Sequence, residues 1–109
     1  MRDFLLNEIE LGDILVHIDG TKRRRKVYVF ISLGSMTKGG SLRVEELWNG
    51  NWIKNNFPQH SVIKVSPDKL SELVHEYNGL FGPTKNTADD LAYQVESVLA
   101  KSQEIKNEI

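Results

Sequence analysis

The sequence contains no cysteine and no long apolar run. Without cysteine the chain has no disulfide framework, no thiol nucleophile and no thiolate metal site, which fits a reducing compartment. A membrane span needs roughly 18–20 apolar residues, and the apolar start at residues 4–6 breaks off at Asn7-Glu8, too early for a signal peptide. These absences predict a cytoplasmic protein that has no membrane contact.

Catalytic signatures are missing as well. The chain has no G-x-G-x-x-G, G-x-x-x-x-G-K-[ST] or G-x-S-x-G motif. His17, His60 and His75 lack the short spacing of a zinc site. We therefore expect no enzymatic activity, no cofactor and no metal, and a protein that functions by binding.

The charge changes sign along the chain. Residues 1–66 carry ten Lys/Arg against seven Asp/Glu, whereas residues 67–109 carry four against eight. Six of the nine aromatic residues also fall in the first part, and aromatic residues favour strands. The sequence thus predicts a β-rich unit over 1–66 and a helical unit over 67–109.

Five short strands are expected in the first part. Period-2 alternation predicts a strand with one buried face at 14–19, and a β-branched and aromatic run predicts a mostly buried strand at 27–31. Asn49-Gly50 is a strong hairpin signal, and the glycines between 34 and 41 indicate a longer turn. The other expected strands cover 42–48, 51–54 and 62–65. Such closely spaced strands favour a small barrel.

Two helices are expected after Ser66. Ser66-Pro67-Asp68 supplies an N-cap, a first-turn proline and a carboxylate, and Asn78-Gly79 supplies a stop. Thr87-Ala88-Asp89-Asp90 resembles a capping box, and the second helix is expected to reach about Ser102, or further if Ile105 and Ile109 join its apolar stripe. The stripe comprises Ala88, Leu91, Ala92, Val95, Val98 and Leu99.

The expected fold class is α+β, with a small five-stranded antiparallel barrel followed by two C-terminal helices. The apolar stripe of the second helix must be buried on something. It packs either on the barrel and the first helix, or on a second copy of the chain to form a homodimer.

The opening Gly12-Asp13-Ile14-Leu15-Val16 and the closing Ser61-Val62-Ile63-Lys64-Val65, with the strands between them, carry a resemblance to known folds. Residues 9–66 resemble the five-stranded barrels of the Src-homology-3, Tudor and KOW kind. Small bacteriophage accessory proteins also resemble this arrangement of a barrel and a short helical tail. The pair of tyrosines that peptide-binding Src-homology-3 domains carry near their first long loop is missing here, which argues against a polyproline ligand.

Five consecutive cations form the clearest candidate site: Lys22, Arg23, Arg24, Arg25 and Lys26. They occupy a predicted hairpin loop, and guanidinium groups bind phosphates with two hydrogen bonds. A nucleic-acid backbone therefore fits this loop. The alternatives are an acidic protein surface, contact with the acidic helices of the same chain, or a loop that is simply solvated.

Trp48 and Trp52 flank Asn49-Gly50-Asn51 and are expected to lie near each other across the hairpin. If exposed, they offer a stacking platform for bases or a wall for a cation; if buried, they stabilise the hairpin as a cross-strand pair. Together with Tyr28 they complete the first functional hypothesis, a nucleic-acid-binding module. The second is a protein-interaction module or small inhibitor of a host or partner protein, which acts through the barrel loops or the acidic helices.

Overall fold

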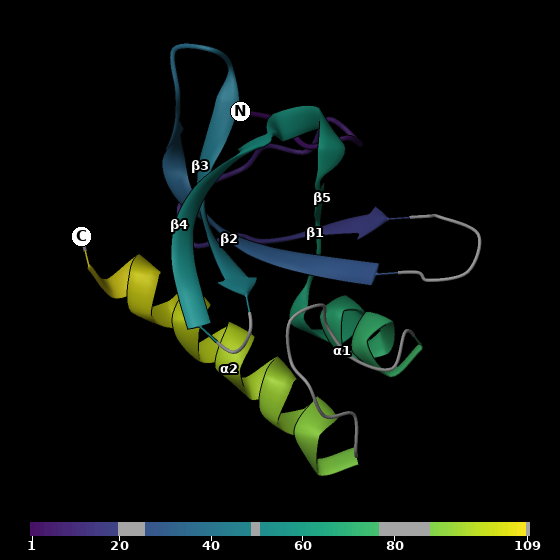
Figure 1. Ribbon diagram of the computed structural model, residues 1–109. Helices are drawn as coiled ribbons and strands as arrows, with labels where there is room; N and C mark the ends of the chain where they lie inside the picture. Colours follow the sequence, from purple (N-terminus) through teal and green to yellow (C-terminus); the bar gives the residue numbers. More distant parts are fainter. Residues whose placement is uncertain (20–25, 49–50, 77–87, 109) are drawn as a thin grey trace.

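The computed structural model describes residues 1–19, 26–48, 51–76 and 88–108 (Figure 1). They form one antiparallel sheet of five strands and two α-helices, so the expected α+β class is confirmed. The elements in chain order are β1 (Ile14–Asp19), β2 (Lys26–Met36), β3 (Ser41–Trp48), β4 (Asn51–Pro58), a 3₁₀-helix (Gln59–Ser61), β5 (Ile63–Lys64), α1 (Pro67–Glu76) and α2 (Ala88–Asn107).

The sheet is open, so the expected barrel is only loosely correct. The strand order is β4-β3-β2-β1-β5, which makes β4 and β5 the two edges of the sheet. β4 ends at Pro58, whose nitrogen has no hydrogen to donate to a further ladder, and the chain enters the 3₁₀-helix. β5 is two residues long and pairs with β1 through Leu15↔Lys64 and Val16↔Ile63.

β2 is longer than its sequence pattern predicted. The turn expected from residue 34 begins only after Met36, because the strand continues through Gly34 with a shift of register against β3 between Ser32 and Met36. Gly34 has a φ of 74°, and a Cβ at this position would lie 3.1 Å from the Cβ of Leu11. Glycine inside a strand often marks such an irregularity, and here it allows β2 to bend without ending.

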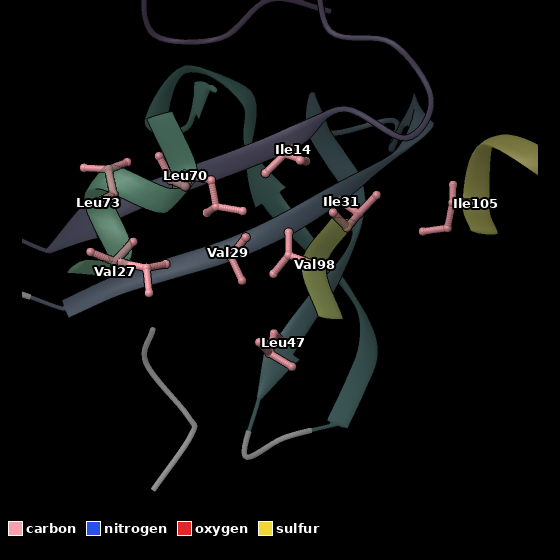
Figure 2. Close-up of a cluster of buried hydrophobic side chains, with 11 residues drawn as sticks. Ile14, Val27, Val29, Ile31, Leu47, Leu70, Leu73, Val98 and Ile105 are labelled. Atoms are coloured by element: carbon pink, nitrogen blue, oxygen red, sulfur yellow. The ribbon is translucent and has the colours of Figure 1, made fainter. Parts of the chain in front are cut away.

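Both faces of the sheet are buried, although only one buried face was expected for β1. The first face packs against α1 and α2 through Ile14, Val16, Val27, Val29, Ile31, Leu47, Leu70, Leu73, Val74, Val98 and Ile105 (Figure 2). On the second face lie Ile9, Leu15, Phe30, Leu42, Val44 and Val62. Ile9 and Val62 come from outside the strands, so the N-terminal segment and the approach to β5 help to cover this face.

The start of α1 agrees with the sequence. The Ser66 hydroxyl accepts a hydrogen bond from the Lys69 backbone N–H at 3.2 Å, which is the expected N-cap. The inward face of α1 buries Leu70, Leu73 and Val74. The expected stop at residues 78–79 lies outside the described residues.

The second helix, α2, extends to Asn107 because its last turns are anchored on the sheet. Ile105 is buried, and the Ser102 hydroxyl donates a hydrogen bond to the carbonyl of Gly12. Val98 of the expected stripe is buried, and Val95 and Leu99 pack against the core, whereas Ala92 is exposed. Farther along the helix, Ser102 and Ile105 continue the buried face. The side chains of residues 88–91 and the expected cap at Thr87 lie outside the described part.

Candidate functional site

The basic run sits between the paired ends of two strands. The register of β1 with β2 continues as far as Asp19↔Lys26, so residues 20–25 connect neighbouring strand ends. This pairing agrees with the hairpin expected from the sequence. Lys22, Arg23, Arg24 and Arg25 lie outside the described residues, and of Lys26 only the backbone is described, as the first residue of β2.

A row of rings leads from the buried face of the sheet toward this hairpin end. Tyr28 pairs with His17 across β1 and β2, and their ring centroids are 5.9 Å apart. The His17 ring is 5.1 Å from that of Phe57, which is 4.6 Å from the fully buried Phe30. Tyr28 is half-buried and stands two residues from Lys26. Its ring thus combines a supported position with partial access to solvent.

His17 is a member of this row that sequence reasoning left among ordinary histidines. Its Nδ1 lies 2.8 Å from the backbone carbonyl oxygen of Ser61, so Nδ1 carries the proton and donates. This bond ties β1 to the 3₁₀-helix and fixes the ring between Tyr28 and Phe57. The one sequence signal for this position is the alternation of β1. Residues two apart on a strand lie on the same face, so His17 could have been placed on the same face as Leu15.

The two tryptophans are not cross-strand partners. β3 ends at Trp48 and β4 begins at Asn51, and this short connection pairs Trp48 with Asn51 and Trp52 with Leu47. The expected pairing of Trp48 with Trp52 assumed that three residues connect the two strands. The connection is one residue shorter, so each tryptophan pairs with a different residue. Trp52 is half-buried and packs against the core on the helix-covered face, whereas Tyr28 packs against the opposite core. The structure therefore does not bring Tyr28 and Trp52 together.

Trp52 contributes instead to a groove between β4 and α2. The groove has a volume of 410 Å³ and its lining includes Tyr93, Glu96, Lys101 and Glu104 of α2. Lys101 Nζ lies 3.3 Å from Glu45 Oε2 and 3.7 Å from Glu104 Oε2. Carboxylates thus outnumber cations here, and the aromatic rings beside them suit a positively charged group.

The sequence pattern did not single out Tyr93, because this residue is not part of the apolar stripe of its helix. The side chain is 71% exposed, which is unusual for so large a ring and sets it apart from the packed face of α2. That packed face lies on the chain's own sheet through Val98 and Ile105. Dimerisation through this helix stays a prediction, and these contacts favour internal packing over it.

Among residues 1–19, 26–48, 51–76 and 88–108, no three His, Asp or Glu side chains are grouped so that they could hold a metal ion. In the same ranges neither helix has the length and apolar character needed to cross a membrane. Comparisons with protein-family models, with curated proteins and with solved structures found no match to this chain.

Proposed function

We propose that this protein is a non-enzymatic binding module that contacts nucleic acid through residues 22–26 and Tyr28. The observation that carries the proposal is the pairing of β1 with β2 up to Asp19↔Lys26, beside a half-buried Tyr28. In this arrangement the cations of the connection neutralise phosphates, and the half-buried Tyr28 ring, which lies beside His17, stacks on a base.

The strand order of the sheet does not by itself assign a role. The strands β1 to β4 follow one another as neighbours, and β5 returns to pair with β1. This order is compatible with the Src-homology-3, Tudor and KOW kind of fold, although the sheet stays open. Because such folds serve many functions, the proposal depends on the hairpin and its ring rather than on the topology.

The test is a binding titration of the full chain with fluorescently labelled 20-nucleotide single-stranded DNA, single-stranded RNA and duplex DNA, repeated at several salt concentrations. Each phosphate contact on a single strand contributes a log–log salt slope of about −0.7. We expect a slope of several units, and a loss of about tenfold or more in affinity when Arg23, Arg24 and Arg25 are replaced by Ala. A flat salt dependence contradicts the proposal.

A charge-matched control separates the loop from the general charge of the protein. Lys38, Arg43 and Lys54 are exposed cations on the turn after β2, on β3 and on β4. Replacing these three by Ala removes the same charge and is expected to leave affinity within about threefold of the parent, since diffuse charge contributes less than phosphate contacts. Equal losses in both variants would show that the loop is not the binding site.

The groove beside α2 favours a second candidate function, a protein-interaction module. Trp52 and Tyr93 provide ring surfaces and Glu96 and Glu104 provide carboxylates, which together suit a lysine or arginine side chain of a partner. In this version Glu96→Lys abolishes recovery of the partner from cells that express the tagged protein. Replacement of Arg23, Arg24 and Arg25 leaves that recovery unchanged, the reverse of the result expected for nucleic acid.

A further inference from the structure

The N-terminal segment folds into a loop that presents apolar side chains to solvent. Arg2 and Glu8 form an isolated antiparallel bridge, and the Ile9 N–H donates to the Met1 carbonyl at 3.0 Å. At the tip of this loop, Phe4 is 64%, Leu5 59% and Leu6 63% exposed. In the described ranges only Ile53 and Tyr93 are comparable exposed large hydrophobic residues, so the tip gathers most of them in one place.

A buried carboxylate fixes the shape of the loop. Asp3 is 0% exposed, and its Oδ1 accepts hydrogen bonds from the backbone N–H groups of Leu5 at 2.9 Å and Asn7 at 2.8 Å. Its Oδ2 accepts from Asn7 Nδ2 at 3.2 Å and from the Lys64 N–H at 2.8 Å. Because Lys64 belongs to β5, these bonds attach the loop to the edge of the sheet.

The backbone at the tip is strained. Leu6 has a φ of 64°, in the left-handed region that residues other than glycine, asparagine and aspartate rarely adopt. The turn is closed by the Leu6 N–H, which donates to the Asp3 carbonyl at 3.0 Å. Glycine would relieve this strain, and a polar residue would be better solvated. The chain instead holds a large apolar side chain that contributes little to its own core, and strain of this kind is typical of functional sites.

We infer that Phe4, Leu5 and Leu6 form an apolar anchor that inserts into a hydrophobic pocket on a protein partner. Binding energy at protein interfaces is concentrated in a few such side chains that fill pockets. Fixing the loop in advance through Asp3 lowers the entropy lost when the anchor binds. This contact is separate from the proposed nucleic-acid contact and does not depend on it.

The size of the tip argues against a second copy as its occupant. Three side chains exposed to about three fifths present on the order of 300 Å² of apolar surface. A stable interface needs about 800 Å² from each partner. Two tips facing each other bury only part of this surface, whereas a pocket encloses the whole tip and its rim also contacts the surface of the chain around the tip.

The charges near the tip argue against a lipid surface. Arg2 Nε is 3.4 Å from Glu8 Oε1, and Lys64 Nζ is 3.1 Å from Asp13 Oδ2, so each of these two cationic side chains has a carboxylate partner. Glu10 adds an exposed negative charge to the same segment. Loops that insert into anionic membranes carry an excess of cations, and this one does not.

The first experiment replaces Leu5 in the full chain by the photo-crosslinking residue p-benzoylphenylalanine, with the same replacement at exposed Lys69 on α1 as the control. We expect one protein adduct that is specific to position 5 and maps to apolar residues of the partner. Equal adducts at both positions, or none at position 5, would overturn the inference.

The second experiment measures binding of the identified, purified partner to three variants. Phe4→Ser and Leu6→Gly are expected to weaken binding at least tenfold, while Ile53→Ser, which removes another exposed apolar side chain, leaves it unchanged. Because glycine accepts a positive φ, Leu6→Gly should melt at the same temperature as the parent or higher, which excludes unfolding as the cause. Comparable binding by the parent and all three variants would refute the anchor.

Two further measurements test the excluded occupants. In sedimentation experiments we expect the parent to form no dimer through the tip. We also expect the parent not to bind vesicles of phosphatidylcholine and phosphatidylserine. A dimer that Phe4→Ser dissociates, or vesicle binding that Phe4→Ser abolishes, would replace the proposed partner. The outcome for nucleic acid is independent, because the tip variants keep residues 22–26 intact.

Discussion

Replacing Asp3 by Asn tests how much the buried carboxylate stabilises the protein. The substitution keeps the size of the side chain and retains an oxygen in the place of Oδ1, which serves the N–H groups of Leu5 and Asn7. An amide NH₂ then takes the place of Oδ2 and faces two donors, Asn7 Nδ2 and the Lys64 N–H. Both donors then lose an acceptor that was fully buried.

The magnitude follows from these unpaired donors. Leaving one buried donor without a partner costs about 1–3 kcal/mol. Because Asn7 Nδ2 can turn toward solvent and the Lys64 N–H is fixed in β5, we expect the free energy of unfolding to fall by about 2–3 kcal/mol. In a chain of this length that loss lowers the melting temperature by roughly 10–20 °C.

The effect depends on pH in a defined direction. Burial acts to raise the pKa of Asp3, but the hydrogen bonds from Lys64, Asn7 and Leu5 lower it below the ordinary 3.8. A carboxyl with a lowered pKa in the folded state stabilises the protein at neutral pH, and this contribution is lost as the pH falls through the folded pKa. The parent should therefore lose stability below about pH 4, while Asp3→Asn lacks this component.

Urea melts of both proteins at pH 7 and at pH 3 measure the prediction. We expect the difference in unfolding free energy between the parent and Asp3→Asn to be larger at pH 7 than at pH 3. If Asp3→Asn is as stable as the parent at pH 7, the four hydrogen bonds contribute nothing net. If the difference is the same at both pH values, the charge of Asp3 is not what stabilises the loop.

Three more substitutions test the fold by thermal melts. Ser66→Ala removes the N-cap of α1 and is expected to cost about 1 kcal/mol, whereas Ser66→Asp should retain the cap. Ile105→Ala truncates a side chain that is 2% exposed and should cost about 2–5 kcal/mol at every protein concentration; a cost that varies with concentration would instead indicate a dimer. Gly34→Ala forces a φ of 74° on alanine and brings its Cβ within 3.1 Å of Leu11, so a loss of about 1–2 kcal/mol is expected and an unchanged melt would contradict it.

The parts of the fold that sequence reasoning predicted best are those set by local chemistry. The cap at Ser66 and the change of period after it depend on neighbouring residues alone, and both agree with the structure. The length of β2 does not agree with its sequence pattern. Gly34 is typical of a turn, and only its close approach to Leu11 and the register shift against β3 explain why the strand continues through it. Likewise α2 continues beyond Ser102 because Ile105 packs in a core formed with strand residues that are far from it in the sequence.

The candidate sites divide in the same way. The run of cations at 22–26 can be recognised from the sequence alone, because the residues are adjacent in the chain and no strand pairing is needed to bring them together. The row formed by Tyr28, His17 and Phe57 requires the pairing of strands and became visible only in the structure. In the sequence, residues 4–6 stand out only as an apolar start too short for a signal peptide, and the bonds to Asp3 and the φ of Leu6, which explain their exposure, require the structure.

The N-terminal loop also accounts for an asymmetry between the two edges of the sheet. At the β5 edge the Lys64 N–H is occupied by Asp3, and the Val62 carbonyl accepts from the Phe4 N–H at 2.8 Å, so the loop covers groups on which another strand could otherwise pair. At the β4 edge the exposed Lys54 and the terminal Pro58 discourage pairing instead. One short loop therefore both protects the sheet and presents the apolar tip, which explains why its internal bonds are so many for so few residues.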